Sequence, residues 1–437
     1  SGKTVWNIPR MCLFSEKYPF MGCMWRKLPS VNKHSIMLSG SVISNDMVEI
    51  YDYFIDRNLM ELLSDTGIND YTKSVRLNFK IRDLWNRLVL DVPENEFAKA
   101  LDSLYVNHVG EVILDSLLSK WNRRWHVSLD SAQSEWLLSR HNHYFRCRSF
   151  KKYVSKEKGL QKVEGMVYNA GREGGLVGVE CNSWRENTYF NAFVEAGEAK
   201  RFSVVRSLDG YAEGMGFFMG LSANRPLVID FEEESCSEDV ASHWHVGSCW
   251  ETITEEEFMA NEAANEYVVD DSDADFELVD ANKTMIQHYF PPKHSYRTLQ
   301  GGHTNCWKDV LGTRFQGDSI RGARIISGGN GKSTATWRAT LPKGYYDVQV
   351  FVYKSLTIPG ASLPSVINHY TVYYGDEQEE IALSLDEALG NKQQGWVSLG
   401  NFDFPGGGVK ITLSNKENNQ NQDIAIIADA VKFVRLE

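Results

Sequence analysis

The segment GYYDVQVFVYK, residues 344–354, alternates apolar residues with polar or aromatic ones and decides the fold class of its region. Strict alternation predicts a β-strand, because successive side chains of a strand point to opposite faces of the sheet. The face interpreted as a core face carries Tyr346, Val348, Val350 and Val352. The opposite face holds more aromatic residues than a solvated surface needs, so we expect it to pack on another element or to bind a flat ligand.

Short alternating segments of the same kind surround this strand. They are TATWRATLP, NHYTVYYGD, GWVSLGNFDF, GVKITLSN and IAIIADAVKFVRL, and Gly, Pro and Asn turns separate them. A second set lies upstream, with GLVGVECNSW, YFNAFVEAG, KRFSVVRSL, GMGFFMGL and RPLVIDF. Several short strands with turn residues between them are typical of antiparallel β-sandwiches. The sequence therefore predicts two sandwiches.

The first third of the chain has a helical period instead. Apolar residues recur three and four positions apart in VEIYDYFIDRNLMELLSD (48–65) and KSVRLNFKIRDLWNRLVL (73–90), which predicts amphipathic helices. The longest predicted helix covers residues 96–125, and a last helical stretch covers residues 134–159.

These patterns predict a multidomain α+β protein. We expect a mostly helical domain at residues 1–160, an antiparallel β-sandwich at 161–250, an acidic linker at 251–265 and a jelly-roll-like β-sandwich at 266–437. The linker is predicted because residues 251–280 contain acidic runs and neither Lys nor Arg, and charge runs are usually solvated.

Composition narrows the classes of function. The chain has 437 residues, of which 42% are hydrophobic, so it can bury cores. Its 58 acidic residues exceed its 46 basic ones, which argues against a nucleic-acid partner, because such binding depends on phosphate neutralisation. No apolar run is long enough to span a bilayer, and SGKTVWNIPR at the start has no apolar signal core. We expect membrane association only through a segment outside this chain.

Cysteine usage leaves the redox compartment open. The chain has 7 cysteines, so at least one is unpaired or pairs outside the chain. Cys236 and Cys249 bracket a short polar loop and could form a disulfide, whereas Cys147, Cys181 and Cys306 are predicted to be small core residues.

Five ordered segments suggest a family for the C-terminal region. They are YVVDDSDADFEL, GNGKSTATWRATLPKGYYDVQVFVY, HYTVYYGDEQEEIAL, QQGWVSLGNFDFPGGGVKITLSN and IIADAVKFV. Together they resemble the golvesin C-terminal-like domain, a carbohydrate-binding-like module attached to xanthan lyases. The resemblance covers residues ~266–437 and implies a β-sandwich on secreted, periplasmic or surface proteins of bacteria. No family is recognised for residues 1–260.

The resemblance directs the search for a ligand site to aromatic residues, since sugar rings stack on aromatic planes. The candidate ligand-binding residues are Trp307, Tyr345, Tyr353 and Tyr373, although each is more simply explained as a core residue. Trp337 and Trp396 occupy positions where the family motif has Trp, and we interpret them as core.

Carboxylates offer a candidate metal site. Asp429 lies in the apolar segment IIADAVKFV, where a charge would be buried and would need a partner. It could join carboxylates of the acidic opening in a structural Ca²⁺ site, with Asp270, Asp271, Asp273 and Asp275 as the other candidates. The alternative is a carboxylate capped by backbone N–H groups, and no other cofactor is expected.

Two histidine patterns are candidates for an active site or a metal site. His141, His143, Tyr144 and Arg146 have the composition of a polysaccharide lyase site, but consecutive residues on a helix would point in different directions. They are more simply explained as a basic, solvated face. His243 and His245, with Cys249, could hold a metal if residues 242–246 form a strand.

The segment GGNGKST (328–334) is not a nucleotide loop, because the pattern requires Gly at the position of Ile326 and a helix to follow. The sequence therefore favours an extracytoplasmic protein whose C-terminal sandwich binds polysaccharide or a cell-surface partner, without nucleotide. The alternatives are a lyase or hydrolase with its site in the helical domain, and the extracytoplasmic part of a larger membrane assembly.

Overall fold

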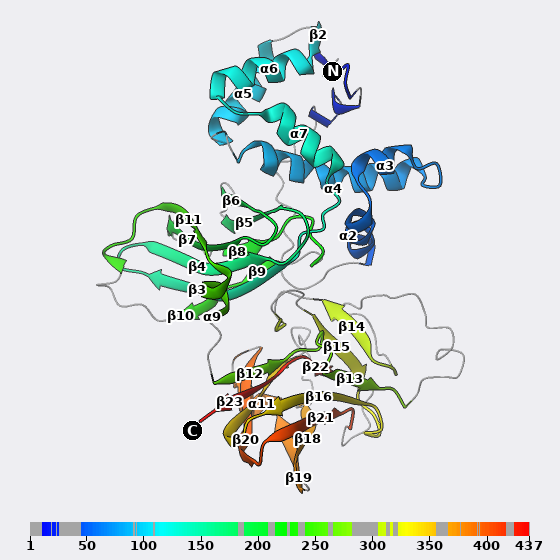
Figure 1. Cartoon of the computed structure of the whole chain (residues 1–437), viewed down its shortest axis with the longest axis vertical. Coiled ribbons are helices and arrows are strands. Elements are labelled where there is room, and N and C mark those ends of the chain that lie inside the picture. The colour runs from blue at the N-terminus through cyan, green and yellow to red at the C-terminus, as the bar shows by residue number, and fades with distance from the viewer. Residues whose placement is uncertain are drawn as a thin grey trace, which may run out of the picture.

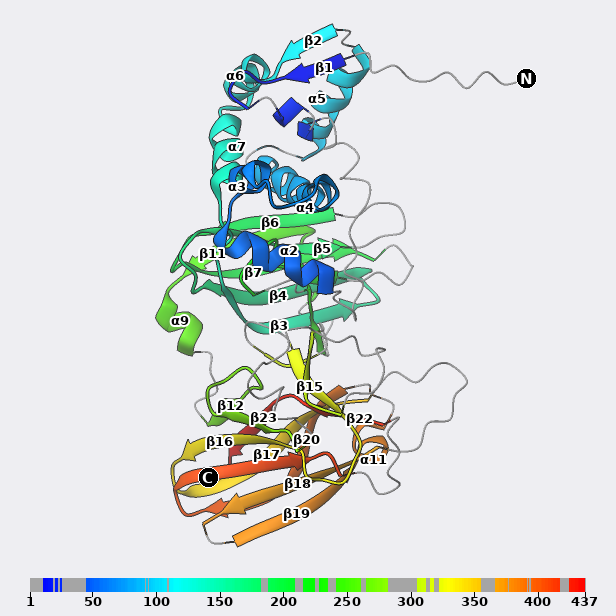
Figure 2. The same ribbon diagram turned by 90° about the vertical axis from the view of Figure 1, so that its right-hand side faces the viewer.

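The chain forms three stacked units, a helical unit, a first sandwich and a C-terminal sandwich (Figures 1 and 2). The computed structural model describes residues 11–18, 20–22, 24–25, 45–90, 92, 94–107, 110–181, 188–208, 215–224, 228–234, 241–260, 265–281, 305–311, 315–317, 322–354, 366–375, 377–390, 392, 394–416 and 424–436. The predicted α+β multidomain class is confirmed. Within these residues, no helix combines the length and the apolar character needed to cross a bilayer.

The helical unit is built from amphipathic helices around one core. Its helices are α2 (Asn45–Asp56), α3 (Leu59–Ser64), α4 (Asp70–Leu88), α5 (Glu94–Asn107), α6 (Leu114–Trp125) and α7 (Leu129–Leu138). Trp25 packs in the centre, with its ring 6.1 Å from Phe97 and 6.0 Å from Trp121. Helices α2 and α3 are separate because Asn58 and Glu61 form a capping box that starts α3.

Two of the predicted helices are wrong in extent. The helix predicted over residues 96–125 is interrupted by strand β2 (Gly110–Ile113), which pairs in parallel with β1 (Met11–Phe14). Gly110 has φ of 103°, a conformation that a helix cannot contain. The stretch predicted over 134–159 is helical only to Leu138, since α7 ends there.

The first sandwich therefore begins earlier than its predicted boundary near residue 160. One sheet contains β3 (Phe145–Ser155), β4 (Leu160–Asn169), β7 (Ala199–Ser207), β10 (Glu232–Glu234) and β11 (Gly247–Ile253), in the order β10-β3-β4-β7-β11. The other contains β5 (Gly175–Cys181), β6 (Thr188–Val194), β8 (Met215–Phe218) and β9 (Val228–Asp230), in the order β6-β5-β8-β9. Stacked Phe202 and Phe217 fill the space between the sheets.

The acidic segment after this sandwich is folded rather than a free linker. Its first residues complete β11, and Glu255–Ala260 forms α9. Phe258 on α9 is fully buried and clusters with Met166, Ala199 and Ile253. The acidic side chains face outward, where Arg201 forms an ion pair with Glu257. A buried aromatic residue therefore docks this segment on the sandwich, which charge alone does not reveal.

The C-terminal sandwich has two large sheets and one small sheet. The first sheet contains β12 (Glu266–Val269), β17 (Gly344–Tyr353), β20 (Gln394–Phe404) and β23 (Val431–Arg435), in the order β12-β23-β17-β20. The second contains β13 (Phe276–Val279), β16 (Thr334–Leu341), β18 (Ile367–Tyr374), β19 (Glu377–Ser384) and β21 (Gly407–Ser414), in the order β13-β16-β21-β18-β19. The small sheet contains β14 (Lys308–Leu311), β15 (Gly322–Ser327) and β22 (Ala425–Ala428), and helix α11 (Leu385–Leu389) follows β19.

The core of this unit confirms the alternation in GYYDVQVFVYK. Tyr346, Val348, Val350 and Val352 are buried between the sheets, together with Trp337. The adjacent residues Tyr345, Asp347 and Gln349 therefore lie on the outer face of the β12-β23-β17-β20 sheet.

Candidate functional site

The four aromatic candidates of the C-terminal sandwich do not form one surface. Trp307 is 6% exposed and Tyr353 is 2% exposed, so neither offers a ring face to a ligand. Tyr353 instead packs against Phe315 beside the small sheet, with ring centroids 5.5 Å apart. Trp307 and Tyr353 are therefore core residues and not ligand-binding residues.

The two remaining tyrosines lie on opposite sides of the sandwich. Tyr345 is 44% exposed on β17, whereas Tyr373 belongs to β18 of the second sheet. The ammonium group of Lys410 lies 3.7 Å from the centroid of the Tyr373 ring and covers it. Only Tyr345 is thus available for stacking, and the two rings cannot contact the same small ligand.

Around Tyr345, the outer face of the sheet is rich in hydrogen-bonding groups. The register of β17 and β20 places Tyr345 opposite Asp403, and Asp347 opposite Asn401. Further along, Gln349 lies opposite Ser398, and its amide donates a hydrogen bond of 2.6 Å to Asp347. We call this surface the outer sheet face. It consists of Tyr345, Asp347, Gln349, Trp396, Ser398, Asn401, Asp403 and Lys432.

Trp396 closes the far end of the outer sheet face. The sequence predicts a core residue here, but Trp396 is only half-buried, because its strand position points away from the sandwich interior. Its ring meets Phe351 at 5.4 Å, and the ammonium of Lys432 lies 4.8 Å from its centroid. The outer sheet face therefore has an aromatic side chain at each end, with amides, hydroxyls and carboxylates between them.

A carboxylate triad lies in the same unit, formed by Asp270, Asp271 and Asp429. One oxygen of each residue lies within 4.8 Å of the other two, and the three residues are 7%, 6% and 2% exposed. Asp270 and Asp271 follow β12, and Asp429 sits between β22 and β23. The fold thus brings the two ends of the C-terminal sequence together, as the metal hypothesis requires.

The charge of the triad is only partly compensated. Arg324 contacts Asp271 through Nε at 2.9 Å and also pairs with Asp309, and the backbone N–H of Gln316 donates to Asp429 at 3.1 Å. Oδ2 of Asp270 and Oδ1 of Asp271 are buried without a hydrogen-bond partner. Burial raises the pKa of Asp270 to about 6 and the pKa of Asp271 well above its usual range. Holding the three carboxylates of the triad this close together therefore costs free energy of folding.

The other acidic and histidine candidates lie outside this triad. Asp273 accepts a hydrogen bond of 2.8 Å from the backbone N–H of Asp270 and closes the turn, and Asp275 is exposed. A metal at His243 and His245 requires a strand over residues 242–246, but this segment turns instead and both histidines are exposed on it. Among the described residues, the triad is the single group of three possible ligands close enough to share one ion. Cys236 lies outside the described residues.

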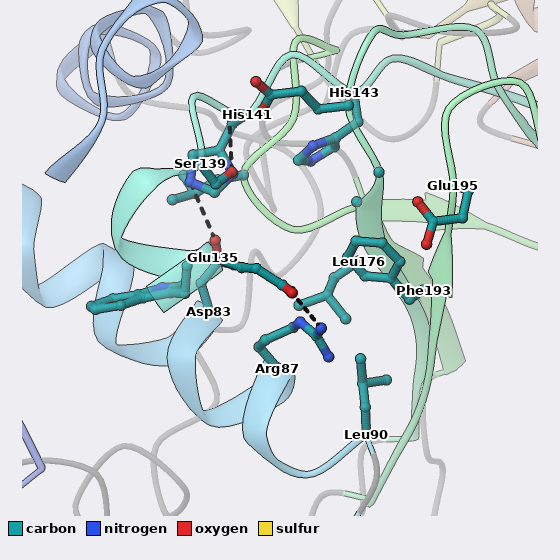
Figure 3. Close-up of a pocket in the computed structure, with 15 residues that line it drawn as sticks. Asp83, Arg87, Leu90, Glu135, Ser139, His141, His143, Leu176, Phe193 and Glu195 are labelled. Carbon is teal, nitrogen blue, oxygen red and sulfur yellow. Dashed lines mark hydrogen bonds and ion pairs between the residues drawn. The ribbon is translucent and has the colours of Figure 1, made fainter. Parts of the chain in front are cut away.

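A second site lies between the helical unit and the first sandwich. Here α4 and α7 face the start of β5 and the end of β6 across a cavity of about 540 Å³, which we call the interdomain cavity (Figure 3). Its lining includes Asp83 and Arg87 of α4, Leu90 after the end of this helix, Glu135 and Trp136 of α7, Ser139, His141 and His143, Glu173–Leu176, Phe193, Glu195 and Leu221.

His141 and His143 meet in this cavity on the irregular segment between α7 and β3, where His141 has φ of 54° and the chain therefore turns. Their two rings lie 5.6 Å apart. Tyr144 and Arg146 are absent from the lining, and the guanidinium of Arg146 contacts Met259 of α9 at 3.6 Å. The predicted lyase set is therefore split between two locations. It is not a solvated face either, since both histidines are buried.

Lys80 is the feature of this cluster that sequence analysis missed. It is fully buried and donates hydrogen bonds to His141 Nε2 and to the carbonyl of Trp136, the latter at 3.3 Å. Burial lowers the pKa of Lys80 to about 8. Burial, followed by the charge of Lys80, lowers the pKa of His141 well below its usual range and that of His143 to about 3. A signal existed, because Lys80 falls on the apolar stripe of α4 between Leu77 and Leu84.

Comparisons with known proteins assign no family to the chain. A model of the family Bacterial toxin 35 matches residues 281–338, a small part of the chain. No curated protein sequence matches the chain.

Several solved structures match parts of the chain at low similarity. Paenibacillus xanthan lyase is 13% identical, with a TM-score of 0.28 over 63% of this chain and 23% of that one. The GH26-CBM35 β-(1,4)-mannanase of Podospora anserina is 11% identical, with a TM-score of 0.22 over 40% and 28%. A β-glucuronidase of Bacteroides uniformis is 10% identical, with a TM-score of 0.21 over 63% and 27%. The chain spans about a quarter of the length of each, and likenesses this low assign no activity.

Proposed function

We propose that the C-terminal sandwich is a binding module for polysaccharide and that the outer sheet face holds the polymer. The observation that carries this proposal is the arrangement of that face, an exposed Tyr345 and a half-exposed Trp396 separated by polar side chains. Trp396 packs against Phe351, so positions 345 and 351 of β17 mark the two aromatic ends of the face. They lie ~20 Å apart at ~3.3 Å per residue, which is enough for several sugar rings in a row.

Each part of the face suits a part of a sugar. The apolar C–H side of a pyranose stacks on an aromatic ring, and its hydroxyls donate to carboxylates or exchange hydrogen bonds with amides. Asp347, Asn401 and Asp403 provide those groups at adjacent register positions. Lys432, which also pairs with Glu266 at 3.7 Å, would add a contact for a uronate carboxylate, so acidic polymers belong to the expected ligands.

Affinity gel electrophoresis of the full chain in acidic and neutral polysaccharides tests this function. We expect retention by at least one polymer and a fivefold to tenfold weaker affinity for Tyr345→Ala, since aromatic stacking contributes ~1 kcal/mol. Tyr373→Ala, on the opposite sheet, is the matched control and should behave as the wild type. Absence of retention on every polymer, or equal loss in both variants, would contradict the proposal.

We also propose that the carboxylate triad binds Ca²⁺ as a structural ion. Oxygens bound to one Ca²⁺ at 2.3–2.6 Å lie at most ~5 Å apart, and the triad oxygens lie within 4.8 Å of one another. The unpartnered oxygens of Asp270 and Asp271 support an additional positive charge at this position. The ion would join the turn after β12 to the junction of β22 and β23, and so hold the sheet that carries Tyr345.

Thermal unfolding of the EDTA-treated protein with added Ca²⁺ or Mg²⁺ tests the ion. Saturating Ca²⁺, at 100 times Kd, should stabilise the folded state by about 2.7 kcal/mol. Asp271→Asn should abolish the effect, whereas Asp275→Asn, in the same segment but outside the triad, should keep it. An unchanged transition in the wild type would show that the triad holds no ion.

The extracytoplasmic location remains part of this proposal, because polysaccharide at a cell surface is the expected ligand. Fractionation of the native host followed by detection of the protein would test it. Recovery from the cytoplasm would count against both location and ligand.

A further inference from the structure

The interdomain cavity carries more negative than positive charge. Its lining contains Asp83, Glu135, Glu173 and Glu195, but Arg87 is the one cation among them. Arg87 is already engaged with Glu135 at 2.7 Å. The two histidines add no charge at neutral pH, because burial and the nearby Lys80 keep them neutral.

The helical side of the cavity is internally compensated. Lys80 lies behind His141, outside the lining, and Nε2 of His141 is 3.7 Å from Asp83. The charge of Lys80 acts on Asp83 and also on Glu173, because both carboxylates partly oppose the lowering of its pKa. A ligand entering the cavity would not contact Lys80, since this residue is fully buried.

The sandwich side has no ion pair of its own among the described residues. Neither Glu173 nor Glu195 forms an ion pair with any described residue, and Glu173 accepts one hydrogen bond of 3.3 Å, from the backbone of Arg140. Gly174 leaves room for the carboxylate of Glu195 and the ring of Phe193, because it has no side chain. A Cβ at Gly174 would lie 2.8 Å from Oε2 of Glu195 and 2.4 Å from the ring of Phe193.

The remaining lining is apolar and suits the carbon part of an organic molecule. Phe193, Leu176, Leu221 and Leu90 contribute these surfaces. The guanidinium of Arg87 already lies 5.1 Å from the centroid of Phe193, so attraction for a further cation comes from the carboxylates and not from that ring. A metal ion is disfavoured, since the described groups close enough to share one ion are those of the carboxylate triad.

We propose that the interdomain cavity binds a small organic cation, a molecule with a primary amine and a carbon framework of up to about disaccharide size. Glu173 and Glu195 are its counter-ions, and Phe193, Leu176 and Leu221 contact its framework. This site is separate from the outer sheet face and does not depend on the function proposed for that face.

Isothermal titration calorimetry at pH 7 tests the site with two amines, glucosamine and spermidine. N-acetylglucosamine is the neutral match for glucosamine, because it keeps the ring and removes the charge. We expect the full chain to bind at least one of the amines, and glucosamine about tenfold tighter than N-acetylglucosamine. Absence of binding by both amines, or equal affinity for the charged and the neutral sugar, would overturn the proposal.

Isosteric variants locate the site. Glu173→Gln and Glu195→Gln should each weaken amine binding about tenfold, whereas Glu157→Gln, on the exposed turn between β3 and β4, should match the wild type. Circular dichroism of each variant checks that it is folded. Retained affinity in both cavity variants would refute the assignment, and Tyr345→Ala should bind the amine as the wild type does, which separates this site from the outer sheet face.

Discussion

Replacing Lys80 with methionine would remove a fully buried amine from the Lys80–His141–Asp83 cluster while keeping most of its side-chain volume. Burial lowers the pKa of Lys80 from its ordinary value of 10.5 to about 8. Between these two pH values the unfolded chain keeps a proton that the folded protein has released. The free energy of unfolding of the wild type therefore rises with pH across this window.

The size of the effect follows from the pKa difference. A change from 10.5 to about 8, at about 1.4 kcal/mol for each pKa unit, amounts to ~3 kcal/mol. The folded wild type should thus gain up to ~3 kcal/mol between pH 8 and pH 10.5. The Lys80→Met variant lacks the group and should lose this gain. Its stability at pH 7 reports a second effect, because the carbonyl of Trp136 loses its hydrogen bond from Lys80.

Urea unfolding followed by tryptophan fluorescence at several pH values measures the difference, since Trp85, Trp121 and Trp136 belong to the core of the helical unit. The quantity compared is the slope of the free energy of unfolding against pH in the wild type and in Lys80→Met. Tyrosine titration contributes equally to both slopes and therefore cancels. Lys99→Met, at an exposed position on α5, is the control and should keep the wild-type slope. Equal slopes for Lys80→Met and the wild type would refute the electrostatic interpretation of this cluster.

Three further predictions concern the cavity and the acidic segment. Burial lowers the pKa of His143 from 6.5 to about 3, so the folded state should lose stability as pH falls from 6.5 towards 3, and His143→Leu should reduce that slope in acid titrations followed by circular dichroism. Gly175→Ala should lower the free energy of unfolding in urea by ~1–3 kcal/mol, because its Cβ would lie 2.3 Å from the His143 ring. Gly408→Ala is the control and should be neutral, because the space around Gly408 is open. Equal costs for the two variants would contradict close packing at Gly175. Phe258→Ala should cost ~3–5 kcal/mol and expose α9 to limited proteolysis, and an unchanged cleavage pattern would mean that α9 is not docked.

Local periodicity was enough to predict the fold class. The alternation in residues 344–354 gave the correct core face, and the spacing of apolar residues gave α4 correctly, because these signals depend on neighbouring residues alone. The errors lie where a local pattern was overridden. Residues 145–148 alternate buried and half-buried side chains and form a strand, although their cations resemble the exposed end of a helix. The helix predicted over 96–125 stops where β2 pairs with a distant strand.

The sequence by itself determined that Asp429 would be buried and would need a partner. A carboxylate within an apolar strand is buried along with its neighbours, and a buried charge requires a compensating group. Only the tertiary structure decided which partner. The chain brings Asp270 and Asp271 to Asp429 and leaves Asp273 and Asp275 outside, a choice made by strand pairing across the whole C-terminal unit. The interdomain cavity was beyond sequence analysis for the same reason, because Lys80, His141 and Glu195 belong to separate elements. Contacts between elements far apart in the chain depend on packing, and local periodicity carries no information about them.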